Sequence, residues 1–338
     1  MVKAAPEPLP RVTLVVAMRN EQRFIERCIR SILEQDYPAD LLEALVFDGG
    51  STDRSRAIAE SLVAERDDWL VADNSGLVQS SGWNLGIGRA TGEVIGIVSA
   101  HTELAPDYVT QAVETLRRTG ADLVGGPVRA QGATYEGQAI AVATSSPFGI
   151  GGARAHYTER EEEVDTVFQG LCLRSVYERI GSFDPEMVRN QDDEFSYRLR
   201  ARGGRIVCNP AIRSRYHNRG TLRSLARQYF HYGFWKVRVM QKLPRQMQVR
   251  HFVPPVFVAS LLGAAVWSLV APAGLVALGL VAGSYAICNL AASAVAAKKA
   301  GIRYAPIMPI VFATLHLSWG IGFLVGLPWW YLGRLRRR

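Results

Sequence analysis

The sequence predicts an α/β domain with a mostly parallel sheet flanked by helices, followed by amphipathic interface helices and C-terminal transmembrane helices. Three features predict this order: apolar runs that alternate with amphipathic stretches, then a basic and aromatic segment, then long uncharged runs. The 338 residues suggest about two structural units. A hydrophobic content of 48% excludes a disordered or low-complexity protein.

Residues 1–210 are expected to form the α/β domain. Val12 to Ala17 is a short, β-branched apolar run, which is typical of a parallel strand buried on both faces. Residues 24–35 carry apolar side chains at helical spacing, and further strand-like runs cover residues 42–47 and 94–98. This alternation predicts a sheet that binds its ligand at the carboxyl ends of the strands. Neither a GxGxxG motif after the first strand nor a P-loop motif is present.

Residues 211–250 interleave basic and aromatic side chains. Such a pattern alone could form a nucleic-acid surface. Because it directly precedes a membrane segment, we interpret it as interfacial helices in the lipid headgroup layer, and we expect no nucleic-acid partner. The formal net charge of +8 agrees with an anionic membrane or a phosphorylated substrate.

Residues 251–338 are expected to form the transmembrane region. Runs over 253–270, 273–297 and 305–327 approach or exceed the roughly 20 residues that a membrane-spanning helix needs. Two crossings would return the basic residues 298, 299 and 303 to the side of the first domain, in agreement with the positive-inside rule. A third crossing would place the arginines at 334 and 336–338 on the opposite side, against that rule. We expect three crossings, with a turn back near residues 320–322 as the alternative.

The N-terminal residues and the cysteines bear on location. Residues 1–10 contain no apolar run, so we expect no signal peptide and a cytoplasmic catalytic domain. The four cysteines form no CxxC pair and no metal-ligand spacing. They are expected to be small buried side chains in a reducing compartment.

Three motifs resemble the inverting family 2 glycosyltransferases, which have the GT-A fold. They are Ala17-Met-Arg-Asn-Glu21, Asp48-Gly-Gly-Ser-Thr-Asp53 and Asn190-Gln-Asp-Asp-Glu194. Val98-Ser-Ala-His-Thr102, the segment 227–236 and the terminal apolar helices are similar to succinoglycan-type β-1,3-glucosyltransferases of exopolysaccharide biosynthesis. The resemblance covers essentially the whole chain and implies a nucleotide-sugar-binding GT-A domain.

The resemblance implies nucleotide contacts from residues at the strand ends. Asp48 would accept a hydrogen bond from the uracil ring, Glu21 would lie near the ribose, and Ala17, Arg19 and Ser99 complete the set. The residues themselves leave alternatives open. Asp48 could be a turn residue in a Gly-Gly loop, Glu21 could be a favourable charge at a helix N-terminus, and Arg19 could be solvated.

Ser99-Ala100-His101 stands where GT-A enzymes usually have Asp-x-Asp, whose carboxylates engage Mg²⁺ or Mn²⁺. The succinoglycan-type relatives resemble Asp-Ala-His here, so His101 matches that group and Ser99 does not. We expect a divalent cation, Mn²⁺ or Mg²⁺, with His101 as its ligand beside two phosphates. Alternatively, His101 and nearby arginines replace part of the metal's role, or His101 is buried with a backbone partner.

Asp192 matches the family's catalytic Asp, with Gln191 in place of the usual Glu. By resemblance it would be the general base that deprotonates the acceptor hydroxyl. Asp193 is the runner-up. Neighbours on a helix differ by about 100°, so only one of the two can face the acceptor well. Either could instead be a favourable charge at a helix N-terminus.

Two further segments are acceptor or diphosphate candidates. Gln169 and Gly170 stand in the place of the family's acceptor loop, with a turn into a strand as the alternative. Gln228, Tyr229 and Trp235 stand where processive relatives carry Gln-x-x-Arg-Trp, with a packed aromatic face as the alternative. Because that processive pattern is broken here, we expect the transfer of single sugars.

Together these expectations describe a non-processive glycosyltransferase of the cell inner membrane, multi-pass, with a cytoplasmic catalytic domain. Its partners would be a UDP-sugar donor, with UDP-glucose expected, a polyprenyl-diphosphate-linked sugar acceptor and membrane lipids. One alternative is transfer to bare polyprenyl phosphate. Another is a catalytically inactive membrane scaffold, because Ser99 and Gln191 replace two carboxylates.

Overall fold

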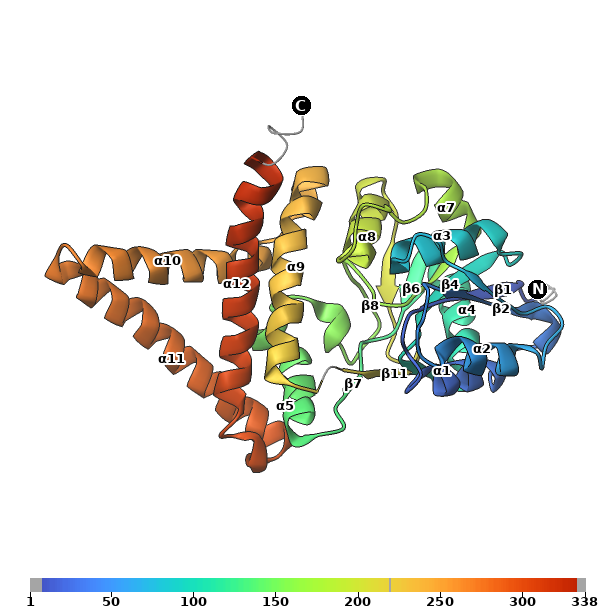
Figure 1. Ribbon diagram of the computed structural model, residues 1–338, viewed down its shortest axis with the longest axis horizontal. Helices are drawn as coiled ribbons and strands as arrows, with labels where there is room; N and C mark the ends of the chain where they lie inside the picture. The colour runs from blue at the N-terminus through green and yellow to red at the C-terminus, as the bar shows by residue number, and fades with distance from the viewer. Residues whose placement is uncertain (1–7, 219, 333–338) are drawn as a thin grey trace, which may run out of the picture. The chain divides into compact units, whose positions relative to one another are not determined.

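The computed structural model describes residues 8–218 and 220–332, and the chain divides into two compact units (Figure 1). The first unit is Met1–Val128 with Thr158–Tyr216, and the second is Arg129–Tyr157 with His217–Arg338. Residues 129–157 were expected within the first domain, and they group with the C-terminal helices.

The first unit confirms the predicted α/β class. Its main sheet has the strand order β3-β2-β1-β4-β9-β6-β10-β8. The strands are β1 (Val12–Met18), β2 (Leu42–Asp48), β3 (Leu70–Asp73), β4 (Val94–Ser99), β6 (Leu123–Gly125), β8 (Glu162–Glu163), β9 (Leu171–Leu173) and β10 (Ile206–Cys208). β1 to β4 pair in parallel, whereas β9 is antiparallel to β4 and to β6. β1, β2 and β4 are buried along their whole length, as apolar parallel strands require.

Helices cover the sheet, and a short strand pair lies beside it. The helices are α1 (Ile25–Leu33), α2 (Ser55–Val63), α3 (Gln79–Arg89), α4 (Tyr108–Thr119), α7 (Arg174–Ile180) and α8 (Gln191–Ala201). The pair is β5 (Thr102–Leu104) with β11 (Ser214–His217), antiparallel. α1 buries Ile25, Cys28, Ile29 and Ile32, the apolar stripe that its sequence predicts.

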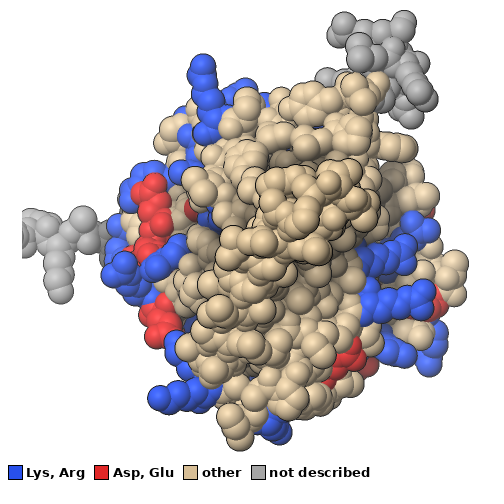
Figure 2. Space-filling view, turned by 90° about the vertical axis from the view of Figure 1, so that its left-hand side faces the viewer, with Lys and Arg blue, Asp and Glu red and all other residues tan. Residues whose placement is uncertain are grey.

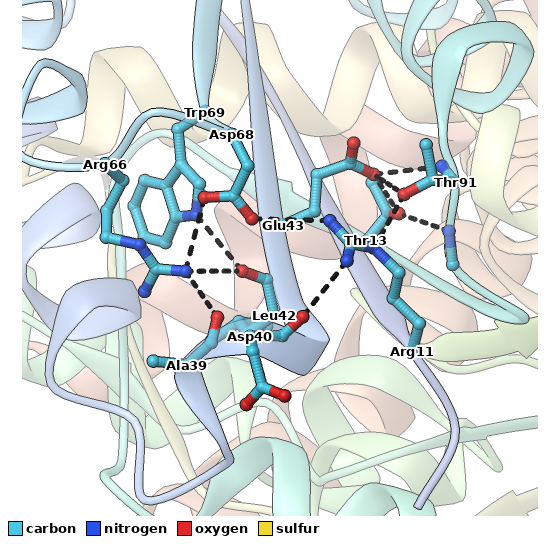
Figure 3. A network of polar contacts seen from close by, with 11 residues as sticks. Arg11, Thr13, Ala39, Asp40, Leu42, Glu43, Arg66, Asp68, Trp69 and Thr91 are labelled. Carbon is cyan, nitrogen blue, oxygen red and sulfur yellow. Dashed lines mark hydrogen bonds and ion pairs between the residues drawn. The ribbon is translucent and has the colours of Figure 1, made fainter.

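The amino ends of the strands are joined by a polar network (Figure 3). The buried Glu43 of β2 accepts hydrogen bonds from the hydroxyl of Thr13 and from the amide and hydroxyl of Thr91, the latter two at 3.0 and 3.1 Å. Arg11 donates to Thr91 at 2.8 Å and pairs with Asp68 at 3.3 Å. The network holds β1, β2 and the approach to β4 together, opposite the end where ligands bind.

The second unit is helical apart from β7 (Ala130–Gln131). Its helices are α5 (Tyr135–Thr144), α6 (Pro147–Ile150), α9 (Leu222–Lys242), α10 (Val253–Ser268), α11 (Pro272–Ala300) and α12 (Met308–Leu332). Three segments are long and apolar enough to cross a membrane: Val249–Ser268, Pro272–Ala300 and Met308–Leu332. This confirms the prediction of three C-terminal apolar helices. The arginines at 334 and 336–338 lie outside the described residues.

α9 and α12 run side by side (Figure 1). Small residues permit this close approach: a Cβ atom added to Gly322 would lie 2.0 Å from the carbonyl oxygen of Phe230, and one on Gly233 would lie 2.1 Å from that of Trp319. Glycine at such contacts lets two helix backbones come close together. The basic and aromatic helix therefore packs directly on the last apolar helix.

Candidate active site

The strand register brings the predicted nucleotide-binding positions to one edge of the sheet. Met18 is paired with Asp48 and Asp48 with Asp73, while Ala17 is paired with Ser99. Met18, Asp48, Asp73 and Ser99 are the last residues of the four adjacent parallel strands β1 to β4, and Ala17 directly precedes Met18. The carboxyl ends of parallel strands form the usual ligand crevice of an open α/β sheet.

Two loops at this edge are bonded to each other. Asn20 has a positive φ of 57°, and its amide donates to the hydroxyl of Ser51 at 2.9 Å. Its side-chain oxygen accepts from the amide of Thr52 at 2.8 Å, and the amide of Glu21 donates to Ser55 at 2.7 Å. The loop that carries Arg19 and Glu21 is thus held against the loop that follows Asp48.

Asp48 is the buried last residue of β2. It accepts hydrogen bonds on Oδ1 from the amide of Ser51 at 3.1 Å and from its hydroxyl at 2.6 Å, so it does form the turn that its Gly-Gly context suggests. Arg56 lies 3.9 Å from Oδ2 and also pairs with Asp73 at the end of β3. A carboxylate offers about four acceptor positions, so the turn leaves capacity for a ligand.

His101 and Glu21 form the centre of the site. His101 Nδ1 lies 3.1 Å from Oε1 of Glu21, and Ser99 Oγ lies 3.2 Å from His101 Nε2. The two side chains are 25% and 24% exposed, so both can reach a ligand. The partners of His101 are therefore the carboxylate of Glu21 and the hydroxyl of Ser99, and not a backbone group in the core.

Aromatic rings surround His101. The ring of Tyr216 lies 5.0 Å from that of His101, and Phe24 lies 6.4 Å away. Phe168 packs edge-on against Tyr216 at 5.2 Å. Tyr216 is not among the residues predicted from the sequence, and β11 brings it to the site by pairing Tyr216 with Thr102 of β5. Arg56 and Asp73 were not predicted either, although the position of Asp73 at a strand end was a usable signal.

The segment with Gln169 and Gly170 lies beside the end of β4. Gln169 has a φ of 56°, its Nε2 donates to the hydroxyl of Thr102 at 2.6 Å, and its carbonyl accepts from the phenol of Tyr108 at 2.6 Å. Burial raises the pKa of Tyr108, so this phenol stays a neutral donor. A Cβ on Gly170 would lie 2.5 Å from the carbonyl oxygen of Val124, so packing against β6 alone explains this glycine.

Asp192 and Asp193 lie in the first turn of α8, which follows Asn190 with its positive φ of 57°. Both are half-buried, and the amide of Asp193 donates to Asp192 Oδ1 at 3.0 Å. Glu194 is buried and pairs with Arg198 at 2.8 Å. The acidic run therefore divides into a structural Glu194 and two carboxylates at the helix start.

Gln228, Tyr229 and Trp235 lie on α9, in the second unit. Gln228 donates to the phenol of Tyr232 at 2.8 Å, and the ring of Trp235 lies 5.0 Å from that of Trp330. Tyr229 packs against a hydrophobic cluster of the second unit. Contacts within this unit thus account for all three side chains, and an acceptor role for them stays a prediction.

The donor set for a metal ion is small. Among residues 8–218 and 220–332, no group of three or more His, Cys, Asp or Glu side chains could hold a metal ion. Glu21 and His101 offer one oxygen and one nitrogen ligand side by side. A divalent cation fits here when phosphate oxygens of a bound ligand complete its coordination.

Comparison with known proteins agrees with this geometry. A family model described as Glycosyl transferase family 2 matches residues 13–181. The chain belongs to glycosyltransferase family 2. The predicted family and the transferase class are thereby confirmed.

Two relatives of this glycosyltransferase cover most of the chain. The succinoglycan biosynthesis protein ExoA of Rhizobium meliloti is 28% identical over 96% of each chain. A dolichyl N-acetyl-α-D-glucosaminyl phosphate 3-β-D-2,3-diacetamido-2,3-dideoxy-β-D-glucuronosyltransferase of Methanococcus voltae is 26% identical over 68% of this chain and 74% of its own.

Solved structures share the predicted GT-A fold. The mannosyltransferase PcManGT from Pyrobaculum calidifontis, in complex with GDP-Man and Mn²⁺, has a TM-score of 0.60 at 20% identity, covering 96% of this chain and 89% of its own. TarS of S. aureus, in complex with UDP, has a TM-score of 0.51 at 14% identity, covering 96% and 92%.

Proposed function

We propose that this glycosyltransferase moves a hexose, with glucose from UDP-glucose as the expected donor, onto a polyprenyl-diphosphate-linked sugar. The observation that carries the proposal is the edge of the sheet where Asp48, Glu21 and His101 meet at adjacent strand ends. Further support comes from the relative named for succinoglycan biosynthesis, which matches 96% of the chain.

Each part of the donor has a candidate partner at this edge. Asp48 would accept from the uracil N–H on Oδ2, which receives only a longer contact of 3.3 Å from the amide of Ser51. Ala17 and Ser99 would line the crevice between the loops, and Arg19 would contact the nucleotide from the loop after β1. Arg56, with its guanidinium 3.9 Å from Oδ2 of Asp48, would help to orient this carboxylate.

The diphosphate would lie at the Glu21–His101 pair. His101, with Glu21 beside it, would hold Mn²⁺ or Mg²⁺, with Mn²⁺ the better match to an imidazole ligand. When bound, the cation would neutralise the charge that develops on the leaving diphosphate. Ser99, which replaces a carboxylate, leaves this site with one negative charge fewer than an Asp-x-Asp site, so we expect weaker cation binding.

The transfer itself requires one base. Asp192 would take the proton from the acceptor hydroxyl while that oxygen bonds to the anomeric carbon from the face opposite the diphosphate. The bond from the anomeric carbon to the diphosphate breaks in the same step, UDP leaves, and the configuration inverts. No covalent intermediate with the protein forms, and Asp193 is the alternative base.

The acceptor is proposed to be a lipid at the cytoplasmic face of the plasma membrane. The second unit contains three helices apolar enough for a membrane, which would keep a polyprenyl chain near the enzyme. The Methanococcus relative is named for a sugar linked to dolichyl phosphate, which is a lipid-linked sugar. Gln169 of the first unit and Gln228, Tyr229 and Trp235 of α9 are the candidate contacts to the acceptor or its diphosphate.

A donor and acceptor screen on the detergent-purified chain tests the proposal. Release of UDP would be followed for UDP-glucose, UDP-galactose and UDP-N-acetylglucosamine, each with polyprenyl-diphosphate sugar or with bare polyprenyl phosphate, with and without Mn²⁺. We expect UDP release only in the reaction that contains UDP-glucose, the sugar-bearing lipid and Mn²⁺ together. Product formation on bare lipid phosphate would replace the proposed acceptor, and release from another nucleotide sugar would replace the donor.

A further inference from the structure

Residues 129–157 fasten both ends of the α10–α11 hairpin. Arg250, just before α10, donates to the carbonyl of Gly152 at 2.7 Å. Between α11 and α12, the carbonyl of Arg303 accepts from the phenol of Tyr135 at 2.5 Å, and Arg303 donates to Gln138 at 3.2 Å. Because the chain passes from residues 129–157 directly into the first unit at both ends, the hairpin begins and ends on one side of any membrane.

The hairpin itself is a lipid-facing surface. From Phe252 to Ala297 the chain carries no charged side chain, and the tip residues Leu269 and Val270 are each 82% exposed. Figure 2 looks onto the apolar helices and shows a face whose centre is free of Lys, Arg, Asp and Glu. The tip, Leu-Val-Ala-Pro-Ala-Gly over residues 269–274, has no polar side chain, and a short turn joins the two helices there.

α12 has a different environment, because α9 accompanies it. Gln241, near the end of α9, donates to the carbonyl of Trp330, near the end of α12, at 3.0 Å. A crossing by α12 would therefore take α9 across with it. Of the five basic residues on α9, Lys236 and Arg238 are buried inside the protein, Lys242 ends the helix, and Arg223 and Arg227 are exposed. Burying a charged residue at the centre of a membrane costs about 2.5–3.5 kcal/mol each.

The chain between α9 and α10 leads to the same conclusion. It leaves α9 beside Trp330 and returns along α12, since the ring of His251 lies 6.5 Å from that of Trp319 and Phe252 lies 6.0 Å from Phe323. Over these residues the backbone forms only two short 3₁₀ turns, and Arg245 is exposed. Irregular, lipid-exposed backbone does not occur in the hydrocarbon region, so this half of α12 lies outside it.

The open face of α12 is apolar. Protein covers the face with Val311, Leu315 and Gly322, whereas an adjoining stripe is exposed. The stripe consists of Ile310, Ile321, Val325 and Leu332. α12 is apolar on all its faces, so the basic residues that meet lipid headgroups in a surface arrangement come from its neighbour α9.

We propose that only the α10–α11 hairpin enters the hydrocarbon core, and that α12 lies along the surface of an anionic phospholipid bilayer beside α9, with its exposed stripe toward the lipid. This arrangement rests on the membrane location in the proposed function and replaces the expected third crossing. The end of α12 stays on the side of the first unit, and the exposed Arg223, Arg227 and Arg245 meet anionic headgroups.

Depth-dependent quenching tests this arrangement in vesicles of phosphatidylethanolamine and phosphatidylglycerol. In a Cys288→Ser background, single cysteines at Ile310, Ile321 and Leu332 would carry a fluorophore, and lipids spin-labelled at different depths would quench it. We expect one common shallow depth for all three sites, within about 10 Å of the headgroups. Deep quenching at Ile321 with shallow quenching at Ile310 and Leu332 would show a crossing helix and overturn the proposal.

A matched series on the hairpin is the internal control. The side chains of Val253, Leu262 and Leu269 are 58%, 59% and 82% exposed, so a label on a cysteine at each position can meet lipid. The 16 residues of α10 span about 24 Å, so the label at Leu262 should be deepest and the labels at Val253 and Leu269 shallower. Absence of quenching at Leu269 would contradict membrane insertion itself, and with it the proposed location. Labelling of cysteine tags at the N- and C-termini by an impermeant maleimide shows on which side of the membrane each terminus lies. Both tags on the same side support the proposal, and tags on opposite sides overturn it.

Discussion

The imidazole of His101 lies 3.1 Å from the carboxylate of Glu21, a residue 80 positions earlier in the chain. β1 and β4 are neighbours in the sheet, and the residues that follow these two strands therefore meet. Glu21 orients the ring of His101 and adds negative charge, both of which favour binding of a cation through the imidazole. Glu21, in the loop after β1, thus places a carboxylate beside the imidazole that also contacts Ser99 at the end of β4.

We expect His101→Ala to abolish the response of the transferase to Mn²⁺, because it removes the only nitrogen ligand of the pair. Glu21→Gln should keep the ring in place but raise the Mn²⁺ concentration for half-maximal activity about 10–100-fold. Titration of UDP release with Mn²⁺ measures both. Glu26→Gln, on the exposed face of α1, is the control and should titrate like the wild type. An unchanged Mn²⁺ titration in both site variants would remove the cation from this position.

Asp192→Asn should lower kcat by about 10²–10⁴-fold while donor binding stays within a few-fold of wild type, since a general base acts on the acceptor. Asp193→Asn should have a smaller effect. Single-turnover transfer and calorimetric binding of UDP, measured on both variants, separate chemistry from binding. Loss of transfer in Asp193→Asn alone would assign the base to Asp193, and equal loss of UDP binding would point to a donor role.

The Glu43 network should contribute to stability without touching catalysis. Glu43→Leu removes Oε2, the single oxygen that accepts from all three donors, at a cost of about 2–4 kcal/mol. We expect the melting temperature of the detergent-purified chain to fall by about 5–10 °C. Glu26→Gln breaks only the exposed pair with Arg30 and should shift it by less than about 2 °C. Equal melting temperatures in the two variants would show that the network adds no stability.

The contact between α9 and α12 should tolerate no added methyl group. Gly322→Ala places a Cβ against the carbonyl of Phe230, and such overpacking costs about 1–3 kcal/mol. Gly283→Ala, on α11, meets no atom within 4 Å and improves helix propensity by up to about 1 kcal/mol. The two variants should therefore change the melting temperature in opposite directions, which scanning fluorimetry in detergent can follow. A neutral Gly322→Ala would mean that the two helices can separate at little cost.

Cys28 should be inert in the folded protein. Burial, helped by the charges of Glu21 and Glu103, raises its pKa to about 12, so the thiol is protonated throughout the neutral range. Alkylation by iodoacetamide should stay slow from pH 7 to pH 9 and become fast on denaturation, as mass spectrometry of the Cys28 peptide would show. A labelling rate that rises tenfold per pH unit and approaches that of an unfolded control near pH 9 would mean that the thiol is accessible and its pKa ordinary.

The order of elements could be predicted from the sequence because it depends on local properties. The apolar run from Val12, the helical spacing from Phe24 and the uncharged stretches after Phe252 each specify an element through its own periodicity or length. The candidate residues Asp48, His101 and Asp192 came from the resemblance of their motifs to the family, and their roles stay predictions. The family and the GT-A fold followed from these motifs.

Tertiary structure decided which of these residues share a surface. Tyr216 reaches His101 only through the pairing of β11 with β5, and Arg56 joins Asp48 to Asp73 across two loops. Tertiary structure also decided the neighbours of α12. By composition alone this helix is equivalent to a membrane span. Its packing on the basic helix α9 depends on Gly233 and Gly322, which let the two backbones come close. Apolar length determines that a segment can enter a membrane, whereas the charges packed beside it determine whether it crosses.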